Sequence, residues 1–255
     1  MYHNIFDTHS HYDDEKFNPD REELFNSLQS QGISYVVSCG CDIASTQFNF
    51  DLAQKYDFLY FASGFHPENL EDASFEDLDI IKKFAENEKC VAIGEIGLDY
   101  HWMSSTKKVQ KDFFEAQIQL AKEIDLPVIV HDREAHQDTL DILKATKPKG
   151  VVHCFSGSKE MAKEIIKLGM YIGLNGVVTF NNARKSLEVA KEIPIDRLVL
   201  ETDCPYLAPV PMRGKRNNSA YIQYTAEKIA QLLDMDTQKL LDITNENAKR
   251  LYNIK

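Results

Sequence analysis

The stretch at residues 90–132, CVAIGEIGLDYHWMSSTKKVQKDFFEAQIQLAKEIDLPVIVHD, decides the fold. It holds an apolar run at 90–99, a segment at 108–124 whose large apolar side chains recur at helical spacing, and a second apolar run at 127–132. Parallel strands that are buried on both faces are nearly continuously apolar, and a crossover helix joins one such strand to the next. The stretch therefore predicts a strand–helix–strand unit.

The same alternation runs through the whole chain. Apolar runs that we predict to be strands lie at 5–9, 33–40, 58–66, 90–99, 127–132, 150–155, 170–176 and 197–203. Helical patterns lie at 21–31, 78–88, 108–124, 159–168, 220–233 and 237–252. Ser74 and Asp77 have the spacing of a capping box before the second of these helices, and Asn18-Pro19 is typical of the start of the first.

Eight such strand–helix units in 255 residues predict an α/β protein, a (β/α)8 TIM-type barrel with residues 1–255 as a single domain. The alternative is an open doubly wound sheet. It is less favoured because no glycine-rich phosphate-binding turn follows any of the apolar runs.

Composition narrows the class of protein. Hydrophobic residues make up 43% of the chain and charged residues 27%, which is sufficient for a sizeable core. The 40 acidic residues and 29 basic ones give a net charge of −11, which argues against a protein that coats nucleic acid by bulk charge. This charge is compatible with an enzyme that holds a polyanion locally, through metal ions and a few Arg and Lys side chains.

Neither a membrane span nor a leader is expected. No window approaches the roughly 18 uncharged apolar residues of a membrane helix, and the first residues include neither a basic nor an apolar leader region. The five cysteines are an odd number without zinc or redox spacing, so we predict reduced and mostly buried thiols. We expect a cytoplasmic monomer that does not bind membranes.

Polar side chains close most of the predicted strands. These residues are His9, His11, His66, Glu95, His131, Asp132, His153, Asn175, Glu201 and Asp203. Catalytic groups of a (β/α)8 barrel lie at the carboxyl ends of its strands. The sequence therefore predicts an active site at this end of the barrel.

The residue types at these ends favour metal binding. His9 and His11 are two residues apart on a strand, so both imidazoles point to the same side and can reach one ion; the alternative is a pair of hydrogen-bonded histidines. Glu95 lies within an apolar run, where a charge is costly unless it is paired or metal-bound. A carboxylate has two oxygens and can bridge two cations.

The remaining strand ends complete the set. His131 and His153 each close an apolar strand; each alone is typical of a buried, hydrogen-bonded histidine, but together with Glu95 they favour ligands. Asp203 ends the last strand beside the first strand of a closed barrel, so it is a candidate ligand or the base for the attacking water. Glu201 faces the other side, and we expect it to form a structural salt bridge.

We therefore predict a site for two divalent metal ions. One ion would be held by His9, His11, Glu95 and Asp203, and the other by Glu95, His131 and His153. Two ions in such a site stabilise the attacking and leaving oxygens of an in-line displacement. Mixed His and carboxylate ligands suit Mg, Mn or Zn, and the sequence does not choose among them.

Several motifs together resemble the TatD family of metal-dependent deoxyribonucleases over nearly the whole chain. They are DTHSH at 7–11, GFHP at 64–67, GEIGLDY at 94–100, LPVIVHDR at 126–133, HCFSG at 153–157, ETD at 201–203 and PMRGKRN at 211–217. The resemblance implies an amidohydrolase-like barrel that hydrolyses phosphodiester bonds of DNA, here expected as an exonuclease. All six predicted ligands match the family's ligand positions, with Glu95 where many relatives use a carboxylated Lys. One departure is the loop at 101–106, which lacks the usual Tyr- and Arg-containing stretch.

The sequence also offers candidate substrate contacts. Arg133 can hold a phosphate through bidentate hydrogen bonds, and Arg213, Lys215 and Arg216 form the only basic cluster near the site. His66 is a candidate for contact with a substrate phosphate or with the attacking water. The alternatives are a pair with a neighbouring Asp for Arg133, a solvated loop for the cluster and a turn hydrogen bond for His66. Trp102 and Tyr100 can stack on a base.

Two rival functions share much of this pattern. The first is a hydrolase of the same fold with another substrate, such as a D-aminoacyl-tRNA deacylase. The second is a binding protein with an inactive site, which the complete ligand set disfavours.

Overall fold

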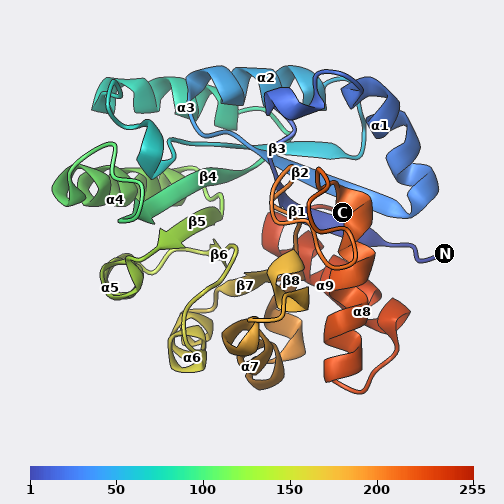
Figure 1. Ribbon diagram of the computed structural model, residues 1–255. Helices are drawn as coiled ribbons and strands as arrows, with labels where there is room; N and C mark the ends of the chain where they lie inside the picture. Colours follow the sequence, from blue (N-terminus) through green and yellow to red (C-terminus); the bar gives the residue numbers. More distant parts are fainter.

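The computed structural model describes residues 1–255 and contains one sheet of eight parallel strands in the order β1 to β8 (Figure 1). The strands are β1 (Ile5–Ser10), β2 (Ile33–Cys39), β3 (Leu59–Ser63), β4 (Cys90–Asp99), β5 (Val128–Arg133), β6 (Gly150–Val152), β7 (Tyr171–Leu174) and β8 (Leu198–Leu200). The helices are α1 (Arg21–Leu28), α2 (Ile43–Ala53), α3 (Leu78–Ala85), α4 (Lys107–Glu123), α5 (His136–Thr146), α6 (Lys159–Lys167), α7 (Arg184–Glu192), α8 (Ile222–Leu232) and α9 (Thr237–Tyr252). The predicted single (β/α)8 barrel is confirmed, with the helices around the strands.

The barrel closes between β1 and β8 at their carboxyl ends. A single parallel bridge, Ser10 to Cys204, joins β1 to the segment that follows β8, in place of a full ladder. The backbone N–H of Asp203 donates to the carbonyl of His9 at 3.0 Å, and that of His11 donates to the carbonyl of Cys204 at 2.8 Å. The closure therefore brings Asp203 beside His9 and His11, as the sequence predicts.

An apolar cluster of 14 residues fills the barrel interior. Every strand contributes to it, with Phe6, Val37, Ala62, Val91, Ile129, Val151, Tyr171 and Val199 among its members. Because only the barrel axis lies near all eight strands, these side chains form the inner core. Leu251 and Tyr252 at the end of α9 join the same cluster. A larger cluster of 50 residues packs the helices against the outside of the strands.

The predicted element ends differ from the observed ones for local reasons. β6 and β8 end at Val152 and Leu200, earlier than expected, and the polar residues beyond them leave the ladder. The helix expected at 21–31 ends as a 3-10 turn, which Gly32 terminates with φ of 91°. Its N-cap is Asp20 rather than Asn18.

Other local predictions are confirmed. The helix at 237–252 has its predicted bounds. The capping box of Ser74 and Asp77 is present, although it starts a 3-10 turn that leads into α3. All five cysteines are free, and three of them are buried. No helix is long and apolar enough to cross a lipid bilayer.

Candidate metal centre

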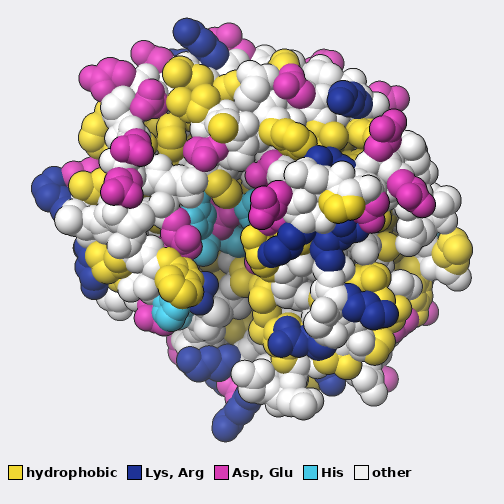
Figure 2. All heavy atoms as spheres, turned by 45° about the horizontal axis from the view of Figure 1, so that its top comes forward, with side chains coloured by type: hydrophobic (Ala, Val, Ile, Leu, Met, Phe, Trp, Pro, Cys, Tyr) yellow, Lys and Arg dark blue, Asp and Glu magenta, His cyan; other side chains and the backbone are white.

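A cavity of about 660 Å³ opens at the carboxyl end of the strands. Figure 2 shows histidine side chains gathered in this hollow, with acidic side chains around them. Its lining includes the predicted residues His11, His66, Glu95, Arg133, His131, His153 and Asp203. The fold therefore brings residues from six separate loops and strand ends to one site.

The first donor group lies at the carboxyl ends of β1 and β8, beside Glu95 of β4. Nε2 of His9 and Nε2 of His11 are 3.0 Å apart and lie 3.3 and 3.4 Å from Oε2 of Glu95. Oδ1 of Asp203 is 3.6 Å from Nε2 of His9 and 3.4 Å from Nε2 of His11. Ligand atoms about 2.1 Å from a tetrahedral ion lie roughly 3.4 Å from one another. This spacing fits one divalent ion.

The second donor group surrounds the other oxygen of the same carboxylate. Oε1 of Glu95 is 2.8 Å from Nδ1 of His131 and 2.6 Å from Nε2 of His153, and these two nitrogens are 3.4 Å apart. Nε2 of His66 also approaches Oε1 of Glu95, at 3.5 Å. His9 and His153 stack with ring centroids 3.8 Å apart, so the two donor groups are in contact.

Glu95 is the shared element of the site. Its side chain is 3% exposed, and each of its oxygens faces a different donor group. Burial opposes its charge, but the imidazoles of His153, His9 and His66 outweigh burial and hold the pKa of Glu95 well below its usual range. A buried, ionised carboxylate between two sets of imidazoles fits a bridging ligand for two cations.

A second layer of side chains fixes the histidines, and the sequence did not reveal most of it. Asp99 accepts from Nε2 of His131 at 3.0 Å and from the backbone N–H groups of His101 and Trp102. Although burial opposes its charge, the bond from His131 holds the pKa of Asp99 well below its usual range. In turn, the bonds to Asp99 and Glu95 overcome burial and raise the pKa of His131 to about 9. A carboxylate behind a ligating imidazole orients it and increases its basicity.

The other histidines have different outer partners. Nδ1 of His9 lies 3.3 Å from the thiol of Cys39, and Nδ1 of His11 lies 3.3 Å from the carbonyl of the same residue. Glu201 lies behind His153, with its Oε1 3.7 Å from Nδ1 of that ring. The structural salt bridge expected for Glu201 has the imidazole of His153 as its partner when that ring is protonated. The same oxygen also accepts from the backbone N–H of Cys154 and from the amide of Asn175.

Asp203 and His66 face the cavity with defined protonation. Burial raises the pKa of Asp203, but the hydrogen bond from His11 and the neighbouring imidazoles outweigh burial and lower it. Burial, with the neighbouring His131, lowers the pKa of His66 to about 3. Because Nδ1 of His66 accepts from the backbone N–H of Glu68 at 3.1 Å, the proton of the neutral ring lies on Nε2. His66 can therefore donate a hydrogen bond into the cavity.

The predicted cations occupy different environments. Arg133 lines the cavity, lies 5.8 Å from the ring centroid of Trp102 and has no carboxylate partner. In the loop after β8, Arg216 forms a bidentate pair with Asp20 at 2.6 and 2.7 Å, whereas the side chain of Lys215 has no ion pair or hydrogen bond. Their roles in substrate binding stay predictions, and a phosphate contact from Arg216 requires its pair with Asp20 to open.

The two aromatic candidates, Trp102 and Tyr100, also lie in different environments. Trp102 is 56% exposed and lines the cavity. The hydroxyl of Tyr100 donates to Asp138 at 2.6 Å, and the ammonium of Lys107 lies over its ring. Tyr100 is therefore engaged outside the cavity.

A parallel-stranded barrel that brings four histidines and two carboxylates together toward the carboxyl ends of its strands has the architecture and the donor set of a metal-dependent hydrolase. Residues 6–253 match the family described as TatD related DNase, and the chain belongs to that family.

Curated relatives span the same length. An uncharacterized metal-dependent hydrolase of Bacillus subtilis, YabD, is 47% identical over 253 residues, covering 98% of this chain and 99% of the relative. A protein of Erwinia tasmaniensis named 3'-5' ssDNA/RNA exonuclease TatD is 33% identical over 259 residues, covering 98% and 100%. Among solved structures, the TatD homologue YJJV of Escherichia coli is 30% identical with a TM-score of 0.91 and full coverage of both chains.

Proposed function

We propose that this chain is an exonuclease that hydrolyses phosphodiester bonds of DNA with two divalent metal ions. The observation that carries the proposal is that the two carboxylate oxygens of Glu95 face different pairs of histidines. Oε2 faces His9 and His11, and Oε1 faces His131 and His153. Mg, Mn and Zn all accept such ligands. When bound, two ions would act as Lewis acids toward the attacking water and the leaving oxygen.

The chain's own residues then have separate tasks. The carboxylate of Asp203, 18% exposed at the cavity, accepts a proton from the water whose oxygen forms the new bond to phosphorus. The bond from phosphorus to the leaving nucleoside oxygen breaks in the same displacement. Nε2–H of His66 and the guanidinium of Arg133, which both line the cavity, would donate to the non-bridging phosphate oxygens.

The choice of DNA rests on the family and on the charge distribution. The family is described as DNases, and two relatives at 33% and 32% identity are named 3'-5' ssDNA/RNA exonucleases. With a net charge of −11, the chain needs local cations to hold a polyanion, and Arg133 is free of carboxylate partners at the cavity. A D-aminoacyl-tRNA ester has no comparable support and serves as the competing substrate in the test.

The test measures product release from single-stranded DNA labelled at either end, with Mg²⁺, Mn²⁺ or Zn²⁺ and with EDTA. We expect stepwise release of mononucleotides that requires the ion and is lost in His131→Ala. His136→Ala is the matched control, because His136 pairs with Asp132 outside the two donor groups. Release of D-amino acid from charged tRNA without nucleotide release from DNA would overturn the proposal.

A further inference from the structure

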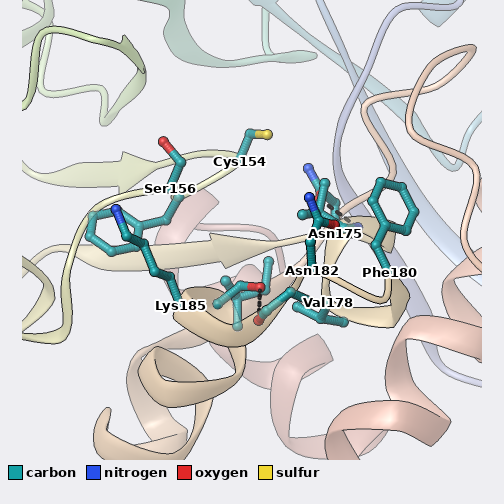
Figure 3. Close-up of a pocket in the computed structure, with 12 residues that line it drawn as sticks. Cys154, Ser156, Asn175, Val178, Phe180, Asn182 and Lys185 are labelled. Atoms are coloured by element: carbon teal, nitrogen blue, oxygen red, sulfur yellow. Dashed lines mark hydrogen bonds between the residues drawn. The ribbon is translucent and has the colours of Figure 1, made fainter.

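A second, smaller cavity of about 220 Å³ lies against the metal centre (Figure 3). It is formed by the segment after β6, the end of β7 with its following 3-10 turn, and the start of α7. Cys154, Ser156 and Val177 line both this cavity and the larger one, so the two meet there. Cys154 directly follows the donor residue His153, so the smaller cavity begins next to the second donor group.

The inside of the smaller cavity is apolar. Leu174, Val178 and Phe155 are buried and line it together with the ring of Phe180. In Figure 3 Phe180 stands on one side of the cavity and Lys185 on the other. The guanidinium of Arg213 lies 3.9 Å from the ring centroid of Phe180 and covers one face of that ring. The cavity thus has an aromatic side chain in its wall, and a cation contacts one face of that ring.

The rim of this cavity is polar and unpaired. Ser156, Asn182 and Lys185 are exposed there, and none of their side chains forms a hydrogen bond or ion pair with the rest of the chain. By contrast, the amide of Asn175 is engaged with Glu201 and with the backbone of Val177. Hydroxyl, amide and ammonium groups around an apolar slot match a flat ring with polar edge atoms.

We propose that this smaller cavity binds one nucleobase of the substrate, next to the phosphodiester under attack. The inference rests on the proposed function, because every scissile phosphate of DNA carries a nucleoside on each side. A volume of about 220 Å³ is below the roughly 300–1,000 Å³ of drug-sized sites, and it suits one ring-bearing group rather than a length of chain. Bases stack on aromatic side chains with little sequence preference, so Phe180 would hold any of the four.

The experiment removes the base and the ring in turn. Single-stranded oligonucleotides carry a tetrahydrofuran abasic residue at the terminal position, at the second position or in the middle of the chain. We expect kcat/KM of the wild-type protein to fall roughly 5- to 100-fold for one of the two end positions and to stay unchanged for the middle one. On unmodified DNA, kcat/KM of Phe180→Ala should fall by the same factor. On the sensitive abasic substrate, Phe180→Ala and the wild-type protein should have the same kcat/KM.

Phe48→Ala is the matched control. Phe48 is likewise a phenylalanine whose ring an arginine covers, with Arg21 4.6 Å from its ring centroid; it is exposed and lies outside both cavities. It should behave like the wild-type protein on every substrate. Calorimetric binding of a deoxynucleoside 5'-monophosphate and of deoxyribose 5-phosphate adds a readout without turnover; the first should bind more tightly, and Phe180→Ala should remove the difference.

The outcomes separate this inference from the proposed function. Equal cleavage of unmodified and abasic DNA by the wild-type protein would overturn the base subsite and leave the exonuclease intact. A Phe180→Ala variant that is equally impaired on all substrates would show a structural role for the ring and would also overturn the subsite. Failure to cleave any of these DNAs would instead reject the proposed function.

Discussion

At the scale of single residues, the site depends most on Glu95, which contacts both donor groups. We predict that Glu95→Ala lowers metal content at both positions and that Glu95→Gln does nearly the same, because the amide lacks the charge that offsets two cations. His153→Ala should empty mainly one position, since its Nε2 faces only Oε1 of Glu95. Losing a ligand weakens such binding by orders of magnitude, so elemental analysis suffices as the measurement.

The control for this prediction is Glu123→Gln, a change of the same kind on an exposed residue of α4. It should keep the metal content of the unaltered chain. Two metals per chain in Glu95→Ala would show that the carboxylate does not bridge.

A second prediction at this scale concerns Asp203 as the base. Asp203→Asn keeps the shape of the side chain and one ligand oxygen but cannot take up the proton of the attacking water. We predict that turnover falls about 10²–10⁴-fold while fold and DNA affinity stay close to wild type. The measurement is phosphodiester hydrolysis at saturating Mg²⁺ or Mn²⁺, with circular dichroism and DNA binding in parallel. Near-wild-type turnover would show that Asp203 is not the base, and the proton would then be taken up by His66 or by hydroxide on the metal ions.

The sequence allowed the donor residues to be predicted, but not the residues behind them. His9, His11, His131, His153 and Asp203 all lie at or just beyond the carboxyl-terminal half of a strand, and Glu95 lies within β4, so the barrel alone implies that they meet. Asp99 lies at the end of β4 as well, yet its contact with His131 depends on the register between β4 and β5. The contact of Cys39 with His9 likewise depends on how two neighbouring strands are aligned, and no local sequence signal encodes either alignment.

At the scale of elements, strands were more predictable than helices. Strands buried on both faces must be apolar throughout, and β4 is buried at all ten positions. The helices α2, α5 and α7 were not singled out. α2 has almost no amphipathic pattern, and α7 is amphipathic but spans only nine residues. Short helices are stabilised mainly by packing against the strands. In α2, for example, Phe48 is exposed whereas Leu52 is buried.

The junction of β4 and β5 carries a prediction of its own. Gly97 pairs with His131 and has φ of +145°, and a Cβ there would lie 2.0 Å from the carbonyl oxygen of His131. Gly97→Ala should therefore push β4 from β5, displace His131 and destabilise the fold by about 3–5 kcal/mol. Denaturant unfolding and metal content are the two measurements.

Gly169 provides the comparison, since it has φ of +86° and nothing within 4 Å of an added Cβ. Gly169→Ala should cost only the left-handed backbone strain, about 1–2 kcal/mol, and leave metal binding unchanged. Equal stability of the two variants would show that β4 and β5 separate without strain.

At the scale of the whole molecule, a net charge of −11 works against binding of a polyanion, so the proposed binding of DNA requires a few cations at the site. Arg133 and Lys215 have no carboxylate partner, whereas Arg216 is held by Asp20 at 2.6 Å. The chain thus contains free and neutralised cations within one active-site face, and these can be compared directly.

The last prediction uses that contrast. Arg133→Ala and Lys215→Ala should each weaken binding of single-stranded DNA regardless of its sequence. Each should also reduce the slope of log K against log salt by about 0.7–1, because binding with one phosphate contact fewer releases fewer counterions. Arg216→Ala removes the same charge from the same loop but breaks the pair with Asp20, so it should lower the unfolding temperature and leave the slope nearly unchanged. The measurement is DNA affinity from 50 to 300 mM salt in the Asp203→Asn background, in which turnover is expected to be about 10²–10⁴-fold lower. A slope that changes in Arg216→Ala and not in Lys215→Ala would mean that the pair with Asp20 opens on DNA binding and that Arg216, rather than Lys215, holds the phosphate.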